Sequence, residues 1–269
     1  MQHTAYVLLQ IEEPMALITL NRPEKLNALS SELLKQLDSL LDVATRDSRV
    51  HVIVITGTGR AFAAGADIHE YMRFTQEEFQ HFTELGGGVN RKIEQLAQPV
   101  IAAVNGYAVG GGFELALSAD MIVASEKAQF GFPEIRLGLF PGGGATQKLP
   151  RLLGIQQARR LILTGEMISA AEAATFGLVY KVVQPDSLLT AATQAAYSLA
   201  TKPLTALAEA KAVLNASLEF PFSTGLALER DRLLNLFISS DAQEGIAAFA
   251  QHRQPRFQSA WQKPVETDN

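Results

Sequence analysis

The sequence predicts an α/β protein with parallel strands up to about residue 200, followed by a region of helices alone. Short apolar runs alternate with segments of helical periodicity, as in parallel α/β architecture. Some of these runs are nearly continuous, which is typical of strands buried on both faces. The runs stop after about residue 188, where only helical patterns follow. These observations fix the fold class before any motif is considered.

The first part of the chain predicts a hairpin, a helix and a buried strand. Residues 6–23 hold two runs rich in Val, Leu and Ile around a turn at Glu12–Pro14. Residues 30–47 carry apolar side chains at the spacing of one helix face, after a serine cap at Ser30 or Ser31. Residues 50–57 (VHVIVITG) then predict a buried parallel strand.

The middle of the chain repeats the order of strand and helix. Residues 59–67 (GRAFAAGAD) predict a loop that leads into a short helix at about Ile68. Residues 75–98 predict a helix that the glycines at 86–88 interrupt or end. The remaining elements, in chain order, are a strand (99–106), a helix that starts at the glycines 110–112, a strand (121–125), a strand and turn (128–139), two helices (142–165), and a helix followed by a strand (169–183).

The C-terminal part predicts helices only, over residues 187–203, 204–218, 223–238 and 241–253. We place a boundary near residue 200. Residues 1–200 are then the core with the functional site, 201–258 a C-terminal helical region, and 259–269 a flexible tail.

Composition indicates a soluble globular protein. Of the 269 residues, 47% are hydrophobic and 19% are charged. The net charge of −5 argues against broad nucleic-acid binding, which needs a basic face. The chain has no cysteine, so disulfides and thiolate chemistry are excluded. No secretory signal and no transmembrane helix are expected, and we predict a cytoplasmic protein.

Two glycine-rich loops predict main-chain donors rather than a phosphate site. The G-x-G-x-x-G pattern fails at residues 110–115 and 142–147, and no Gly-Lys pair occurs for a P-loop. Glycines 110–112 instead open an apolar helix, whose first N–H groups are unpaired and could stabilise a developing oxyanion. A second such N–H lies at Ala66 in AAGAD. Each loop taken alone is better explained as tight packing or an ordinary turn.

Several segments resemble the crotonase, or enoyl-CoA hydratase/isomerase, superfamily, and the similarity runs from about residue 5 to 258. The resemblance implies a spiral of β-β-α turns that forms two roughly perpendicular sheets, followed by a helical trimerisation region. It implies an acyl-CoA substrate of fatty acid β-oxidation, no separate cofactor, and a homotrimer or dimer of trimers. The five histidines form no metal-ligand spacing, so no metal is expected either. The segments that carry it are residues 21–29 (NRPEKLNAL), 62–68 (FAAGADI), 99–120 (PVIAAVNGYAVGGGFELALSAD), 130–154, 163–183 and 239–257.

The same resemblance assigns roles to residues of the site. It implies that Glu114 and Glu134 are the catalytic glutamates and that the N–H groups of Ala66 and Gly111 form the oxyanion hole. Gly142 falls where a main-chain N–H helps to hold water. His69 departs from the family, because a lysine is expected there in several hydratases. Residues expected to contact coenzyme A are Ala64, Gly65, Ala66, Asp67 and Ile68 at the adenine, and Lys25 and Ala28 at the ribose and phosphates, with Arg22, Arg253 and Arg256 as further candidate cations.

These residues suit the hydration of a 2-enoyl thioester. Two N–H donors would stabilise the negative charge on the thioester oxygen. Two carboxyl groups on one water could act as acid and base. Our hypothesis is that Glu114 orients and deprotonates the water and Glu134 handles the proton at the α-carbon, although the division stays open. The segment 71–88, with Phe74, Phe79 and Phe82, would wall the acyl pocket, and its glycines could let that wall move.

Other interpretations remain open from the sequence. Glu114 could be an exposed residue of an amphipathic helix, and Glu134 could cap a turn or pair with Arg136. Within the superfamily, a Δ3-Δ2 enoyl-CoA isomerase needs only one carboxylate, and other members hydrate branched or aromatic enoyl thioesters. A non-catalytic coenzyme A-binding or scaffold protein would keep the fold without the reaction.

Overall fold

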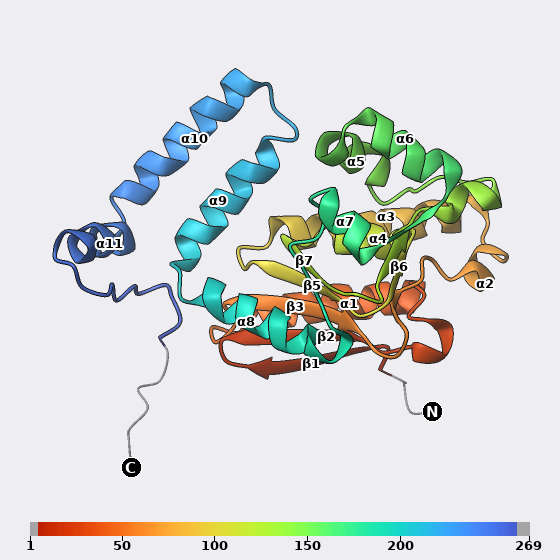
Figure 1. The fold of residues 1–269 in the computed structure, drawn as a ribbon, viewed down its shortest axis with the longest axis horizontal. Helices are drawn as coiled ribbons and strands as arrows, with labels where there is room; N and C mark the ends of the chain where they lie inside the picture. The colour runs from red at the N-terminus through yellow and green to blue at the C-terminus, as the bar shows by residue number, and fades with distance from the viewer. Residues whose placement is uncertain (1–4, 263–269) are drawn as a thin grey trace, which may run out of the picture.

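The computed structural model describes residues 5–262, and its core is a six-stranded sheet. The first two strands form the predicted antiparallel hairpin, and the other neighbours pair in parallel. The predicted α/β architecture with buried parallel strands is therefore confirmed (Figure 1). In spatial order the strands are β1 (Val7–Glu12), β2 (Met15–Leu20), β3 (Val52–Gly57), β5 (Val100–Val104), β7 (Met121–Ser125) and β10 (Lys181–Val183).

A second sheet consists of four short strands: β4 (Ala61–Ala63), β6 (Tyr107–Val109), β8 (Gln129–Gly131) and β9 (Met167–Ser169). A strand of the first sheet is followed by a strand of the second and then by a helix, three times in succession, which is the predicted spiral of β-β-α turns. Residues 61–63, predicted as part of a loop, are a strand, and β9 was not predicted. Strands of three residues are too short to show a period in the sequence.

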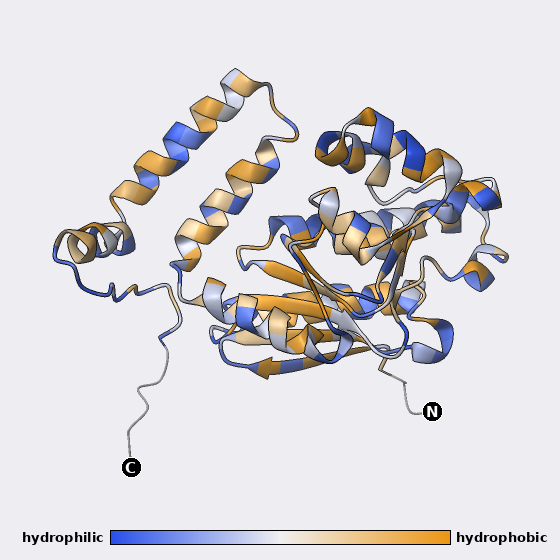
Figure 2. Ribbon diagram, viewed as in Figure 1, coloured by the Kyte–Doolittle hydropathy of each residue, from blue (hydrophilic) through white to orange (hydrophobic). Residues whose placement is uncertain are grey.

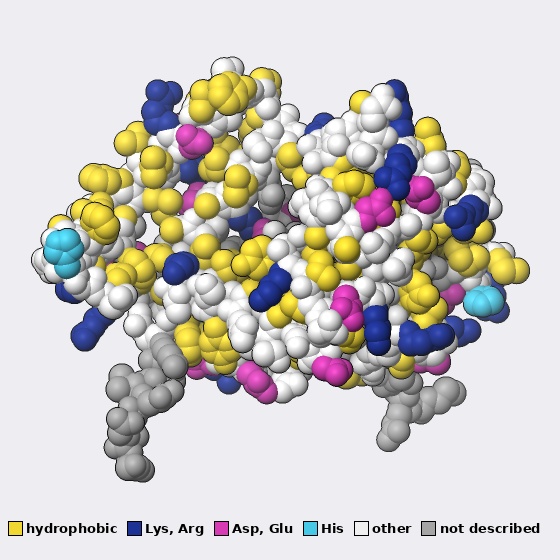
Figure 3. Space-filling view, viewed as in Figure 1, with side chains coloured by type: hydrophobic (Ala, Val, Ile, Leu, Met, Phe, Trp, Pro, Cys, Tyr) yellow, Lys and Arg dark blue, Asp and Glu magenta, His cyan; other side chains and the backbone are white. Residues whose placement is uncertain are grey.

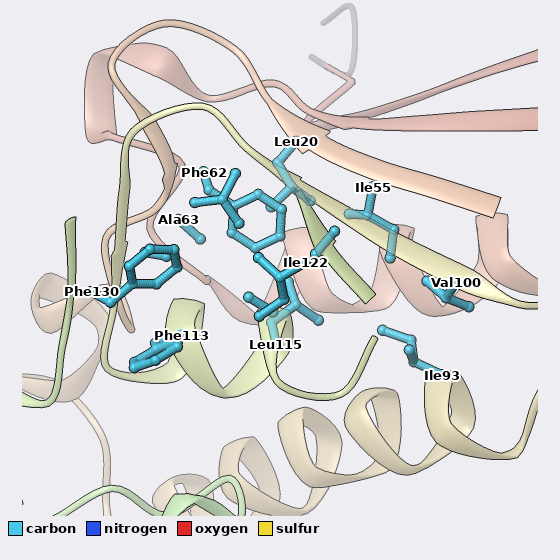
Figure 4. Packing of buried hydrophobic residues seen from close by; sticks show 14 of the residues in the cluster. Leu20, Ile55, Phe62, Ala63, Ile93, Val100, Phe113, Leu115, Ile122 and Phe130 are labelled. Atoms are coloured by element: carbon cyan, nitrogen blue, oxygen red, sulfur yellow. The ribbon is translucent and has the colours of Figure 1, made fainter. Parts of the chain in front are cut away.

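Helices cover both faces of the larger sheet. Helix α1 (Ser31–Arg46) begins where Ser30 Oγ accepts the N–H of Leu33 at 3.2 Å, as the serine cap predicts. Its buried leucines join the main core, where Phe62, Phe113 and Phe130 also pack (Figure 4). The other face is covered by α8 (Leu188–Ala200), which packs on β3, β5 and β7. The central strands are accordingly mostly hydrophobic (Figure 2).

Helix α3 (Gln76–Gln95) is continuous through glycines 86–88, so the predicted interruption is wrong. A capping box between Thr75 and Glu78 starts the helix. Each interior glycine costs about 1 kcal/mol relative to alanine. Burial of Phe82, Val89 and Ile93 holds the helix against the core despite that cost.

The remaining helices of the core are α2 (Ile68–Tyr71), α4 (Gly111–Ala116), α5 (Ala145–Leu153), α6 (Ile155–Thr164) and α7 (Ala170–Thr175), with short 3-10 segments at Pro23–Lys25, Pro133–Leu137 and Pro185–Ser187. Helices α4 and α7 contact strands of the second sheet. Within residues 5–262, none of the helices combines the length and hydropathy that a membrane crossing requires.

The C-terminal helices α9 (Leu204–Ala216), α10 (Phe222–Phe237) and α11 (Ser240–Ala250) extend away from the sheets (Figure 1). Lys211 anchors α9 to the core, because its buried Nζ donates to Asp120 Oδ2 at 2.8 Å and to the carbonyl of Ile93 at 2.9 Å.

The predicted tail does not begin at residue 259. The N–H of Trp261 donates to the carbonyl of Ala200 at 2.9 Å, and the Trp261 ring packs on Tyr197. The N–H of Ser259 donates to Asp241 at 3.0 Å. These contacts tie residues 259–261 to α8 and α11, and the rest of the predicted tail, residues 263–269, lies outside the described residues.

Candidate active site

A cavity of about 340 Å³ brings together segments that are far apart in the sequence. Its walls come from the loop before α2, the first turn of α4, helix α3 and the turn that joins β8 to α5. Most lining residues are apolar or glycine. The lining also includes both candidate glutamates, Glu114 and Glu134. The lining residues used below are Ala64, Gly65, Ala66, Ile68, Tyr71, Phe79, Phe82, Gly86, Gly87, Asn90, Gly110, Gly111, Glu114, Glu134, Gly142 and Gly143.

Glu114 lies in the second half of the first turn of α4 and is only 3% exposed. Its neighbours Phe113 and Leu115 point into the core (Figure 4). Glu114 itself is one of the residues that line the cavity. An exposed position on an amphipathic helix is therefore ruled out. Because an ionised carboxylate is costly to bury, the structure must supply partners for it.

Those partners are main-chain N–H groups of the turn before α5. Oε1 of Glu114 accepts from Gly143 N at 2.7 Å and from Ala145 N at 3.0 Å. Burial raises the pKa of Glu114, and the two N–H donors and the charge of Lys148 offset part of that rise. In the described part of the chain, Oε2 receives no hydrogen bond, so it is available to a ligand or water.

Glu134 stands in the 3-10 turn Pro133–Leu137, and its carboxyl group lies against Gly110. A side chain at position 110 would collide with Oε1 of Glu134, so the glycine permits this approach. Within residues 5–262 the buried Oε2 has no hydrogen-bond partner. Burial, together with the charge of Glu114, raises the pKa of Glu134 to about 7, although its own main-chain N–H lowers it in part. Arg136 donates to the carbonyl of Gly165 instead, so the predicted alternative of a Glu134–Arg136 pair is wrong.

Among the main-chain N–H groups of the cavity wall for which residues 5–262 supply no acceptor are those of Ala66, Gly111 and Gly142. The backbone around Ala66 is held by a bridge in which Leu29 N donates to Gly65 O at 2.8 Å and Asp67 N to Leu29 O at 2.9 Å. N–H groups alternate in direction along an extended segment, so the Ala66 N–H points away from Leu29.

The residues predicted to contact coenzyme A divide into two groups. Ala64, Gly65, Ala66 and Ile68 line the cavity, whereas Lys25, Ala28 and Asp67 do not. The carboxylate of Asp67 is occupied, because it accepts from Arg22 Nη1 at 2.6 Å and from the N–H of His69 at 3.0 Å.

Because Arg22 is paired with Asp67, its charge is not free to bind the phosphates of coenzyme A. The same holds for Arg253, which is paired with Glu244. Lys25 is exposed, and in the part of the chain that the structure describes no carboxylate lies within ion-pair distance of it. Ala64 N donates to Leu26 O at 3.0 Å, so the turn that carries Lys25 lies beside the cavity loop.

Asn90 was not predicted as a site residue, and Tyr71 was predicted only as part of the pocket wall. Asn90, 8% exposed, donates from Nδ2 to the carbonyl of Gly143 at 3.1 Å. The pKa of the Tyr71 phenol, which also lines the cavity, is raised to about 12 by burial and by the charges of Glu114 and Glu134. An asparagine among the apolar positions of α3 was the one available signal in the sequence.

The predicted wall over residues 71–88 is present. Tyr71, Phe79 and Phe82 line the cavity and pack edge to face, with ring centroids 5.1 and 5.3 Å from Tyr71. Phe74 lies behind them against Tyr71 and Phe82 and does not line the cavity. Among residues 5–262, no three His, Asp or Glu side chains are grouped as metal ligands would be.

Comparison with known proteins gives one consistent result. The family described as enoyl-CoA hydratase/isomerase matches residues 10–260. A protein of Rhizobium meliloti named as a probable enoyl-CoA hydratase is 45% identical over 93% of this chain and 97% of its own length. The short-chain-enoyl-CoA hydratase of Clostridium acetobutylicum is 41% identical over 92% of this chain and 95% of its own. The crystal structure of an enoyl-CoA hydratase from Bacillus anthracis superposes with a TM-score of 0.90 at 36% identity, covering 94% of this chain and 99% of that one.

Proposed function

The chain belongs to the enoyl-CoA hydratase/isomerase family, and we propose that it hydrates 2-enoyl-CoA thioesters with two glutamates and a pair of main-chain N–H donors. The reaction adds water across the 2,3 double bond and gives a 3-hydroxyacyl-CoA. The observation that carries the proposal is that the buried carboxyl group of Glu114, the half-buried one of Glu134 and the unpaired N–H groups of Ala66 and Gly111 line one cavity.

The N–H pair would act on the thioester oxygen. As the water oxygen bonds to the β-carbon, negative charge moves to that oxygen, and preset donors stabilise it without reorganisation. Removal of one such donor typically costs about 3–4 kcal/mol of transition-state stabilisation. The N–H groups of Ala66 and Gly111 would therefore account for a large part of the rate.

The environments of the two carboxyl groups support a division of labour. Two N–H donors on Oε1 favour the ionised form of Glu114, which suits a base that takes a proton from water. Glu134 has a pKa of about 7 and a buried oxygen without a donor, which suits an acid that delivers a proton to the α-carbon. An isomerase needs one positioned carboxyl group, so the presence of a second one in the same cavity favours hydration.

The test is to make Glu114→Gln and Glu134→Gln separately and to follow the loss of enoyl absorbance of crotonyl-CoA. Each variant should lose about 100-fold or more in kcat, the usual contribution of a general acid or base. Glu77→Gln is the matched control, because Glu77 is exposed at the start of α3. Near-normal rates in either folded variant of the cavity would contradict the two-carboxyl mechanism.

For coenzyme A, we propose main-chain contacts from Ala64 to Ile68 with the adenine, and contacts of Lys25 and, more loosely, Ala28 with the ribose and phosphates. The exposure of Lys25 beside the cavity loop supports this. No further cofactor is needed, since water and carboxyl groups supply all the protons that move.

We also propose a homotrimer or dimer of trimers, with residues 1–200 holding the site and 201–258 the assembly region, in the cytoplasm and in fatty acid β-oxidation. The supporting observation is the apolar surface of the C-terminal helices (Figure 3). In the single chain Phe222 is 82% and Phe249 is 85% exposed, which is unusual for large apolar side chains unless a partner covers them.

A further inference from the structure

Asn90 is a buried amide in a wall that is otherwise mainly apolar. It lies one turn beyond Gly86 and Gly87 on the face of α3 that lines the cavity. A buried amide destabilises a protein unless it is hydrogen-bonded. A leucine at this position would have no polar group to desolvate. The hydrogen bond that Asn90 makes is therefore the feature to explain.

The contact leads directly to Glu114. Nδ2 of Asn90 donates to the carbonyl of Gly143, whose own N–H donates to Oε1 of Glu114 at 2.7 Å. Gly143 is closely held between them: a Cβ there would lie 2.6 Å from Oε2 of Glu114 and 3.0 Å from Nδ2 of Asn90. The next residue, Gly144, has a φ of +119°, a backbone conformation that favours glycine. The turn therefore depends on external contacts for its orientation.

We propose that Asn90 is a positioning residue for Glu114. By holding the Gly143 carbonyl, it orients the turn 142–145 so that the N–H groups of Gly143 and Ala145 point at Oε1, and Oε2 remains free for the reacting water. The inference rests on the proposed role of Glu114. An amide suits this task because it donates a hydrogen bond without placing a second charge beside the carboxylate.

The chain offers a matched control in Asn215. Its Nδ2 donates to the carbonyl of Glu94 at 2.9 Å, so it too ties α3 to a neighbouring segment, but it does not line the cavity. Asn90→Leu and Asn215→Leu each remove one amide-to-carbonyl hydrogen bond. Only the first removes one that leads to Glu114.

The experiment measures the hydration of crotonyl-CoA against pH for both variants. Asn90→Leu should lower kcat about tenfold with little change in KM, since a lost hydrogen bond to a buried carbonyl has that order of effect. The acid limb of kcat/KM should move to higher pH by about half a unit, because Glu114 loses support for its ionised form. The other groups that face Glu114, namely Glu134, Tyr71 and Lys148, are unchanged. Asn215→Leu should change neither quantity.

A double-mutant cycle separates this role from general damage to the fold. In the Glu114→Gln background, Asn90→Leu should change the residual rate less than about twofold, because the two residues act as one unit. An equal loss in both backgrounds, or an unmoved acid limb, would overturn the proposal. Asn90→Ala serves the same test if the leucine variant does not fold. If Glu114→Gln itself keeps a near-normal rate, the proposed function fails instead, so the two failures are distinct.

Discussion

Replacement of Glu134 by glutamine should make the stability of the protein less dependent on pH. The pKa of Glu134 is about 7 in the folded protein against an ordinary value of 4.5, chiefly because of burial. Below about pH 4.5 both the folded and the unfolded chain hold this proton. Between 4.5 and 7 only the folded chain keeps it, and above 7 both have lost it. Wild-type stability therefore falls as the pH rises through this window.

The size of the effect follows from the same values. The difference between 4.5 and about 7 corresponds to roughly 3 kcal/mol, and the open cavity reduces this to roughly 2 kcal/mol through solvent screening. Between pH 5 and pH 8, the free energy of unfolding of Glu134→Gln relative to wild type should rise by about that amount. Denaturant unfolding at both pH values and one protein concentration measures it, with Glu77→Gln as control. Equal pH dependence in Glu134→Gln and wild type would refute the burial argument.

Three further predictions concern activity. The rate should fall as the pH rises through about 7, because Glu134 then loses the proton that it donates, and this alkaline limb should be absent from the residual activity of Glu134→Gln. Lys25→Ala should raise KM for crotonyl-CoA roughly two- to fivefold, the range for an exposed charge contact. KM for crotonyl-pantetheine, which lacks the nucleotide, should not change. An equal rise of KM for both substrates would show that Lys25 does not contact the nucleotide. Gly87→Leu should lower kcat/KM for octenoyl-CoA about tenfold more than for crotonyl-CoA, because Gly87 lines the cavity and has free space around it. Gly88 does not line the cavity, so Gly88→Leu should lower kcat/KM for the two substrates by the same factor. If both variants changed the ratio of the two kcat/KM values equally, helix flexibility rather than cavity space would be the cause.

The burial of Glu114 could be predicted from sequence because its evidence is local. Phe113 and Leu115 flank it, and glycines precede it, so an exposed helix face fitted poorly. The cavity setting of Glu134 was harder to predict, since a turn carboxylate beside an arginine has an ordinary interpretation. Only the structure shows Arg136 engaged with Gly165 and Glu134 against Gly110.

What the sequence could not predict depends on long-range pairing. Asn90 contacts a carbonyl 53 residues away, and Arg22 pairs with Asp67 across 45 residues. Neither contact leaves a periodic signal. The prediction that glycines 86–88 interrupt a helix was wrong for a related reason. The tertiary packing of α3 outweighs the poor helix propensity of these glycines. The three-residue strands β4, β6 and β9 were missed, since alternation cannot be seen over so few positions.

The central claim is that a thioester oxygen sits between two main-chain N–H groups while two carboxyl groups share one water. A crystal structure with butanoyl-CoA, which is saturated and cannot be hydrated, tests it most directly. We expect the thioester oxygen at about 3 Å from the nitrogens of Ala66 and Gly111, and a water bonded to both Glu114 and Glu134 beside the β-carbon. A thioester oxygen that contacts neither nitrogen, or an acyl chain lying outside the cavity, would contradict the account.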